Sequence, residues 1–74
     1  MQMNNLNVAK IQLNGDSYKI KCGINLIELL NKLKIPNNKV AIEVNGEIVE
    51  KKKYQHFSLN QNDKVEIVHF IGGG

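Results

Sequence analysis

Two Asn-Gly dipeptides constrain the fold of this chain more than any other feature. Asn14-Gly15 and Asn45-Gly46 each lie between segments in which apolar and polar residues alternate. Both residues of such a pair adopt positive φ at little cost, which the tightest hairpin turns require. The sequence therefore predicts two β-hairpins, and the alternation predicts that their strands are buried on one side only.

The first hairpin assigns its side chains to two faces. The inward positions of its first strand, residues 8–13, are Ala9, Ile11 and Leu13, and those of its return strand are Tyr18, Ile20 and Cys22. We therefore expect Cys22 to be a small buried hydrophobe. A role for Cys22 in sulfur transfer lacks support, because no histidine or second cysteine lies near it in the sequence.

A short amphipathic helix follows the first hairpin. Asn25 is typical of a helix N-cap, and Glu28 three residues later completes a capping box. Apolar residues then recur at helical spacing, namely Leu26, Leu29, Leu30 and Leu33. Pro36 ends the helical segment. Roughly ten residues do not form a stable helix alone, so we expect this one to pack its leucine stripe on a sheet.

The second half of the chain contains a strand over residues 40–44 and a short return strand over residues 47–50. The lysine run Lys51 to Lys53 is interpreted as a solvated turn or sheet edge that resists pairing with other chains. Tyr54 and Phe57 lie close to this run, and Leu59 indicates a loop that packs inward.

The last strand, residues 64–71, is apolar on both faces, which predicts a central position in the sheet. One face carries Val65, Ile67, His69 and Ile71, and the other carries Lys64, Glu66, Val68 and Phe70. We expect the first set to meet the helix, with His69 as a structural residue on that apolar side. Val68 and Phe70 would then form an exposed docking patch on the open face.

These elements predict an α+β fold of the β-grasp type. The expected architecture is a mixed sheet of four to five strands with one main helix packed on one face. Residues 1–71 form the domain, and Gly72-Gly73-Gly74 form a flexible tail, because glycine loses the most entropy on ordering. A tail without Cβ atoms is suited to threading a narrow channel in a partner and presenting its terminal carboxylate there.

Composition narrows the function. A chain of 74 residues has little room for an enzyme's cleft, so a carrier, modifier or binding module is expected. Its single cysteine, and the lack of a secretory signal or long apolar run, predict a cytoplasmic protein with no membrane contact, and a monomer is the default expectation. All ten basic residues are lysines, which argues against phosphate recognition. No metal site is expected, since His56 has no partner at metal spacing.

The sequence resembles the ThiS family of thiamine-pathway sulfur carriers, which are bacterial ubiquitin-like proteins. The resemblance covers nearly the whole chain. It includes Leu-Ile-Glu-Leu-Leu at residues 26–30, Val44-Asn45-Gly46, and the Asn62-Asp63 turn. Its most specific part is the sequence from Asp63 to Gly74, in which Val-Glu-Ile-Val-His-Phe leads into the terminal glycines.

The resemblance implies a mechanism. A ubiquitin-activating-type adenylyltransferase would use MgATP to convert the Gly74 carboxylate to an acyl adenylate. A persulfide donor, supplied by a cysteine desulfurase system, would then leave a thiocarboxylate on Gly74, and thiazole synthase would take its sulfur. Gly72 and Gly73 would thread the partner channels, while Val68, Phe70 and Ile71 would dock. The carrier itself would be a co-substrate without a bound cofactor, not an enzyme.

Several alternatives share part of this sequence evidence. A molybdopterin-synthase small-subunit carrier, a protein modifier or a tRNA-thiolation carrier would use the same ending. A small RNA-binding β-grasp module is suggested by the pI of about 9.1 and by Lys51 to Lys53, although the lack of arginine and of stacked aromatics counts against it. A plain interaction domain with a frayed end would be indifferent to loss of Gly73 and Gly74.

Overall fold

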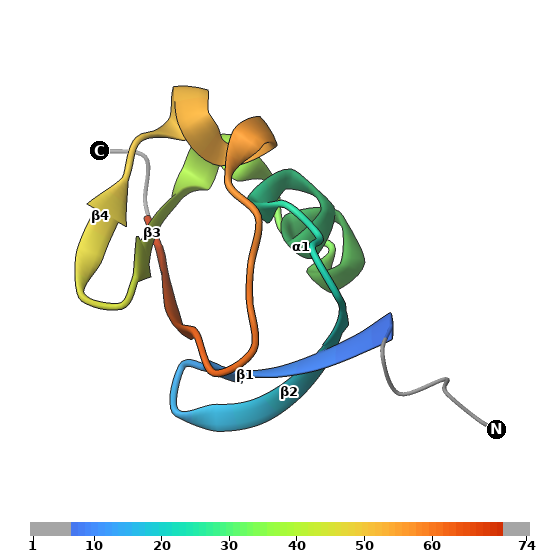
Figure 1. Ribbon diagram of the computed structural model, residues 1–74. Coiled ribbons are helices and arrows are strands. Elements are labelled where there is room, and N and C mark those ends of the chain that lie inside the picture. The colour runs from blue at the N-terminus through green and yellow to red at the C-terminus, as the bar shows by residue number, and fades with distance from the viewer. Residues whose placement is uncertain (1–6, 71–74) are drawn as a thin grey trace, which may run out of the picture.

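The computed structural model describes residues 7–70 as a five-stranded sheet with one α-helix (Figure 1). The elements in chain order are β1 (Val8–Leu13), β2 (Asp16–Lys21), α1 (Leu26–Leu33), η2 (Asn37–Lys39), β3 (Val40–Val44), β4 (Glu47–Val49), η3 (Lys51–His56) and β5 (Lys64–His69). The strand order across the sheet is β2-β1-β5-β3-β4.

Both predicted hairpins are confirmed. Strands β1 and β2 pair antiparallel, as do β3 and β4. The turn residues have positive φ, with values of 49° and 90° at Asn14 and Gly15 and of 55° and 86° at Asn45 and Gly46. The local preference of Asn-Gly therefore determines where each pair of strands reverses.

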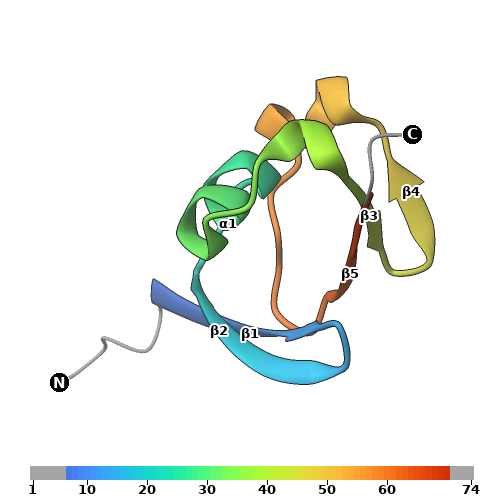
Figure 2. The ribbon, with the colours of Figure 1, turned by 180° about the vertical axis from the view of Figure 1, so that it is seen from behind.

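The central position of the last strand is also confirmed. β5 pairs parallel with β1 and antiparallel with β3, so it joins the two hairpins into one mixed sheet. Helix α1 lies on one side of this sheet, which Figures 1 and 2 show from opposite directions. This is the β-grasp arrangement that the sequence predicts.

Helix α1 begins with the predicted capping box. The Glu28 backbone N–H donates to the Asn25 side chain at 2.8 Å, and the Asn25 N–H donates to the Glu28 carboxylate at 2.9 Å. The helix ends at Lys34, whose φ of 61° is left-handed. Leu26, Leu29 and Leu30 are buried, which places the leucine stripe against the sheet.

The core is continuous between the sheet and α1. Its buried members are Ala9, Ile11, Ile20, Ile24, Leu26, Leu29, Leu30, Val40, Ile42, Val44, Val49, Tyr54, Leu59, Val65 and Ile67. Tyr54 belongs to η3, which contacts α1 and closes one end of this core. Burial raises the pKa of the Tyr54 hydroxyl, and the Ile42 backbone opposes this with a smaller effect. The ring is therefore neutral at physiological pH.

Three predictions about this core need correction. Cys22 is exposed, because β2 ends at Lys21 and the chain turns at Gly23, whose φ is +80°. His69 is also exposed. His69 lies opposite Val40 on the helix side of the sheet. Val40 is the buried residue of this row, and His69 lies at the edge of the core. The lysine run, which lies outside the core, is exposed as predicted, but it begins the 3₁₀ helix η3 and is not a turn or a sheet edge.

The seam between β1 and β5 combines backbone hydrogen bonds with those of one side chain. The Gln12 N–H donates to the Asp63 carbonyl and the Asn14 N–H donates to the Val65 carbonyl, both at 2.9 Å. The two strands pair at only two positions, and then β1 turns away at Asn14. The Asn14 amide replaces the missing strand: it accepts from the Ile67 N–H at 2.7 Å and donates to the Ile67 carbonyl at 3.2 Å. Asn14 therefore extends the hydrogen bonding of β5 by one residue beyond the end of β1.

We expect Asn14→Gly to lower the free energy of unfolding by about 1–3 kcal/mol, because the Ile67 backbone loses both partners. Glycine tolerates the φ of 49° at this position, so backbone strain does not contribute. Urea denaturation would measure the change. Asn14→Asp retains the acceptor for the Ile67 N–H and should lose less. Equal stability of Asn14→Gly and the parent would contradict this role.

Candidate functional site

The candidate site is the open face of the sheet near the end of β5. Alternation places Val65 and Ile67 in the core, and Glu66, Val68 and Phe70 on the opposite, uncovered side. Val68 is 57% exposed and Phe70 is 60% exposed. Their predicted exposure is confirmed, whereas their predicted docking role remains a prediction.

The backbone remains fixed one residue beyond the end of β5. The Phe70 N–H donates to the Lys39 carbonyl at 2.8 Å, which continues the antiparallel pairing with the segment before β3. The aromatic ring therefore projects from a backbone that the sheet positions. The other predicted site residues, Ile71, Gly72, Gly73 and Gly74, lie outside the described residues.

The pairing register places further side chains on the same face. Ala41 of β3 lies directly opposite Val68, and Glu43 lies opposite both Glu66 of β5 and Ile48 of β4. Ile48 is 70% exposed, the largest value among the exposed large hydrophobic residues of the described chain. Ile48 is not among the site residues predicted from sequence, because the register of the short strand β4 determines the face on which it lies.

Between residues 7 and 70, no cluster of three or more His, Cys, Asp or Glu side chains could hold a metal ion. No helix in that part of the chain is long and apolar enough to cross a membrane. The open face instead presents apolar side chains on a rigid sheet, which suits binding to another protein.

The tyrosine and the phenylalanine close to the lysine run pack into or against the core. Lys51, Lys52 and Lys53 are exposed on η3, but the neighbouring Tyr54 is only 2% exposed. Its ring belongs to the core, and Phe57 is half-buried and packs against that core. Single-stranded nucleic acids are bound largely by stacking on exposed aromatic rings, so the burial of Tyr54 counts against the RNA-binding alternative.

Comparison with known proteins gives a consistent set of relatives. The model of the ThiS family matches residues 11–74. The sulfur carrier protein ThiS of Bacillus subtilis is 42% identical over 65 residues, which cover 86% of this chain and 98% of that protein. The crystal structure of the thiamine biosynthesis protein ThiS from Geobacter metallireducens superposes with a TM-score of 0.76. It is 31% identical, with 88% of this chain and 99% of that chain covered.

Longer relatives contain a similar segment. A thiazole synthase of Paramagnetospirillum magneticum is 42% identical to this chain over 65 residues, which cover 88% of this chain. A thiazole synthase of Magnetococcus marinus has the same identity over the same length. The chain spans only 20% of each of these two proteins. Because the family model matches most of the chain and the Bacillus relative is covered almost end to end, the chain belongs to the ThiS family.

Proposed function

We propose that this protein is the sulfur carrier that supplies sulfur for the thiazole ring in thiamine biosynthesis. The observation that carries the proposal is the ThiS family match, which extends through β5 to the terminal glycines. The 42% identity to a sulfur carrier protein over nearly its full length supports the same role. Membership of this family also favours the thiamine pathway over the molybdopterin pathway.

Gly74 carries the chemistry in this proposal. Its carboxylate attacks the α-phosphate of ATP in an adenylyltransferase, pyrophosphate leaves, and an acyl adenylate forms. The terminal sulfur of a persulfide, supplied by a cysteine desulfurase system, then displaces AMP and gives an acyl disulfide. A second thiol cleaves the S–S bond, which leaves a thiocarboxylate on Gly74 and a disulfide on the donor system. The carrier contributes no acid, base or metal and acts as a co-substrate.

The sheet presents the tail to these enzymes. In the proposed arrangement, the β-grasp domain (residues 1–71) docks through Val68, Phe70 and Ile71, and the tail (residues 72–74) enters the partner. Three extended residues reach about 10 Å, which is enough to enter a channel at the docked surface. Glycine is required along the channel, because a Cβ atom would widen the chain.

Thiazole synthase is the proposed acceptor of the sulfur. Two proteins with that name contain a segment similar to this chain. Joining a carrier-like segment to a thiazole synthase converts their encounter into an intramolecular one and raises the effective concentration. That arrangement is expected for a carrier and the enzyme that consumes its sulfur. We further propose that the protein acts in the cytoplasm, where its single cysteine would stay reduced.

The test is mass spectrometry of the untagged protein after incubation with the adenylyltransferase, ATP and a sulfur donor. We expect a thiocarboxylate on Gly74, located by fragmentation or by alkylation. Localisation is necessary because replacing oxygen with sulfur adds nearly the same mass as oxidation of Cys22 or a methionine. If neither adenylate nor thiocarboxylate forms on Gly74, with enzymes that modify another ThiS protein, the proposal is wrong.

A further inference from the structure

The open face of the sheet is divided into three bands, ordered by their distance from the end of β5. The apolar band, next to that end, consists of Ala41, Val68 and Phe70. The acidic band, one row further away, consists of Glu43 and Glu66, with the exposed Ile48 beside Glu43. The next row contains Lys64 of β5. The basic band lies beyond it on the far hairpin and consists of Lys10, Lys19 and Lys21.

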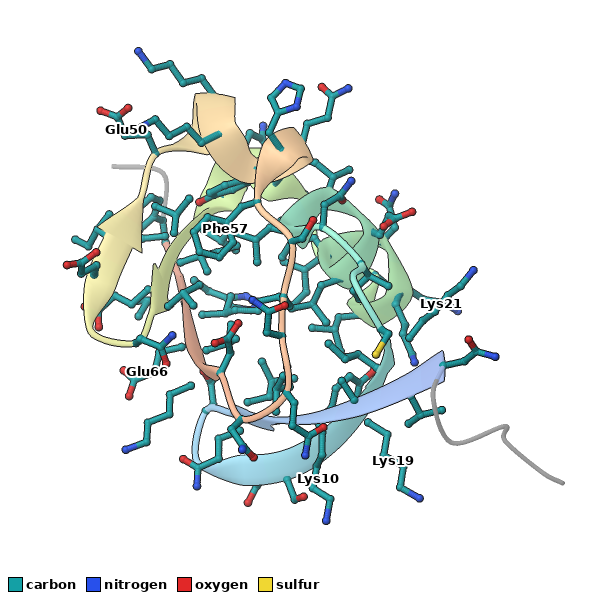
Figure 3. All side chains as sticks on the ribbon, in the orientation of Figure 1. Lys10, Lys19, Lys21, Glu50, Phe57 and Glu66 are labelled. Atoms are coloured by element: carbon teal, nitrogen blue, oxygen red, sulfur yellow. The ribbon has the colours of Figure 1, made fainter. Side chains whose placement is uncertain are left out.

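The register of the strands establishes this order. Lys64, the first residue of β5, is level with Gln12 of the parallel strand β1. Lys10 precedes Gln12 and therefore lies still further from the end of β5. It is directly opposite Lys19, and Val8 is directly opposite Lys21. Figure 3 shows Lys10 and Lys19 extending from the β1–β2 hairpin and Glu66 extending from β5.

Like charges face one another within each charged band of the free protein. Glu43 and Glu66 are directly opposite on neighbouring strands, as are Lys10 and Lys19. Like charges in such positions destabilise a sheet. Within the described part of the chain, the only ion pair closer than 4.0 Å joins Lys52 to Glu50, away from this face. Lys64 lies in the row next to Glu66 and lines the same hollow as Glu43 and Glu66, but it forms no ion pair within 4.0 Å with either. An oppositely charged surface that covers each band would therefore relieve repulsion within it.

We propose that the three bands of the open face bind an enzyme surface with complementary bands. On the enzyme, these bands follow one another in the same order with increasing distance from the mouth of the channel that accepts the tail. That surface carries an apolar patch, then a lysine or arginine against Glu43 and Glu66, then carboxylates against the lysines of β1 and β2. This inference rests on the proposed function and assigns the chemistry of the partner's docking surface. We assign this surface to thiazole synthase.

Such complementarity controls approach and orientation. Opposite potentials on two proteins accelerate association and favour one relative orientation. Because the acidic and basic bands lie at different distances from the tail, only one orientation pairs both bands while the glycines face the channel. The apolar band then supplies the contact area, and the charges select the encounter that delivers Gly74.

The experiment measures the association rate of the full-length carrier with thiazole synthase of the same organism at low and at physiological salt. The acidic-band variant is Glu43→Lys with Glu66→Lys, and the basic-band variant is Lys10→Glu, Lys19→Glu and Lys21→Glu. Matched controls outside the bands change the net charge equally. They are Glu47→Lys with Glu50→Lys, and Lys51→Glu with Lys52→Glu and Lys53→Glu.

We expect each band variant to slow association about tenfold or more at low salt, with a smaller effect at physiological salt. The controls should change the rate by about twofold or less. A gentler variant, Glu43→Gln with Glu66→Gln, removes the repulsion, so it should raise the melting temperature while it slows association. If these carboxylates had a purely structural role, the substitution would not raise the melting temperature and slow association at the same time.

The outcomes separate this inference from the proposed function. Wild-type binding, with band variants that associate as fast as their matched controls, would overturn the polarity proposal and leave the carrier function intact. Absence of wild-type binding would overturn the polarity proposal too. The mass-spectrometry experiment would then decide the carrier function: sulfur on Gly74 would support it, and its absence would contradict it.

Discussion

Adding one residue after Gly74 should abolish the activation of this protein by its adenylyltransferase. The added residue moves the terminal carboxylate by about 3.5 Å along the tail. Displacing a reacting group by even about 1 Å can cost a hundredfold in rate. If the added residue is alanine, the new terminal residue also carries a Cβ atom, which glycine lacks. Release of pyrophosphate from ATP, measured with the extended and parent proteins, checks this expectation.

Two further proteins control the experiment. Adding the same alanine before Met1 should leave pyrophosphate release unchanged, because that end takes no part in the proposed chemistry. Gly73→Val keeps the terminal carboxylate on Gly74 but introduces a branched side chain into the channel, and it should also block activation. Its melting temperature should match the parent, because the described core ends at Ile67. Full activation of the chain extended after Gly74 would refute the tail mechanism.

The sequence predicts the fold well where local interactions determine it. The Asn-Gly turns and the Asn25–Glu28 capping box depend on residues that are adjacent or three apart, so their effects can be derived from sequence alone. The alternation in β5 likewise identifies its two faces. The apolar character of both faces predicts the central position that the pairing with β1 and β3 confirms.

The errors arise at the ends of strands, where alternation no longer predicts burial. Alternation places Cys22 on the same side as the buried Ile20, but β2 ends at Lys21 and the chain turns at Gly23 before Cys22 can join the core. A glycine at that position was the available signal. Alternation likewise places His69 on the same side as the buried Ile67, but no sequence pattern shows how far the core extends along β5. The extent of the core depends on which rows of the sheet α1 and η3 cover.

The candidate site could be predicted only in part. Val68 and Phe70 follow from the pattern of their own strand. Glu43 and Ile48 join the same face only through the pairing of β3 with β5 and β4. Such register between segments distant in sequence depends on tertiary packing. The three bands of the open face are therefore a property of the folded sheet that composition and periodicity do not contain.

Truncating Phe70 and truncating Leu29 should have opposite consequences, although both remove a large apolar side chain. Leu29 is fully buried in the α1 stripe, so Leu29→Ala should cost about 3 kcal/mol of unfolding free energy through lost contacts and a residual cavity. A domain of this size has roughly 4–11 kcal/mol in total. Leu29→Ala should therefore lower the melting temperature by more than about 10 °C.

Phe70→Ala should change the unfolding free energy by no more than about 0.5 kcal/mol, because the ring is 60% exposed. Its affinity for thiazole synthase should fall by about 2 kcal/mol, or roughly thirtyfold, as expected when a central aromatic contact is removed from an interface. Denaturation and binding measured on both variants test the pair together. A Phe70→Ala protein that loses stability but binds normally would mean that the ring supports the core and that the apolar band is not the docking surface.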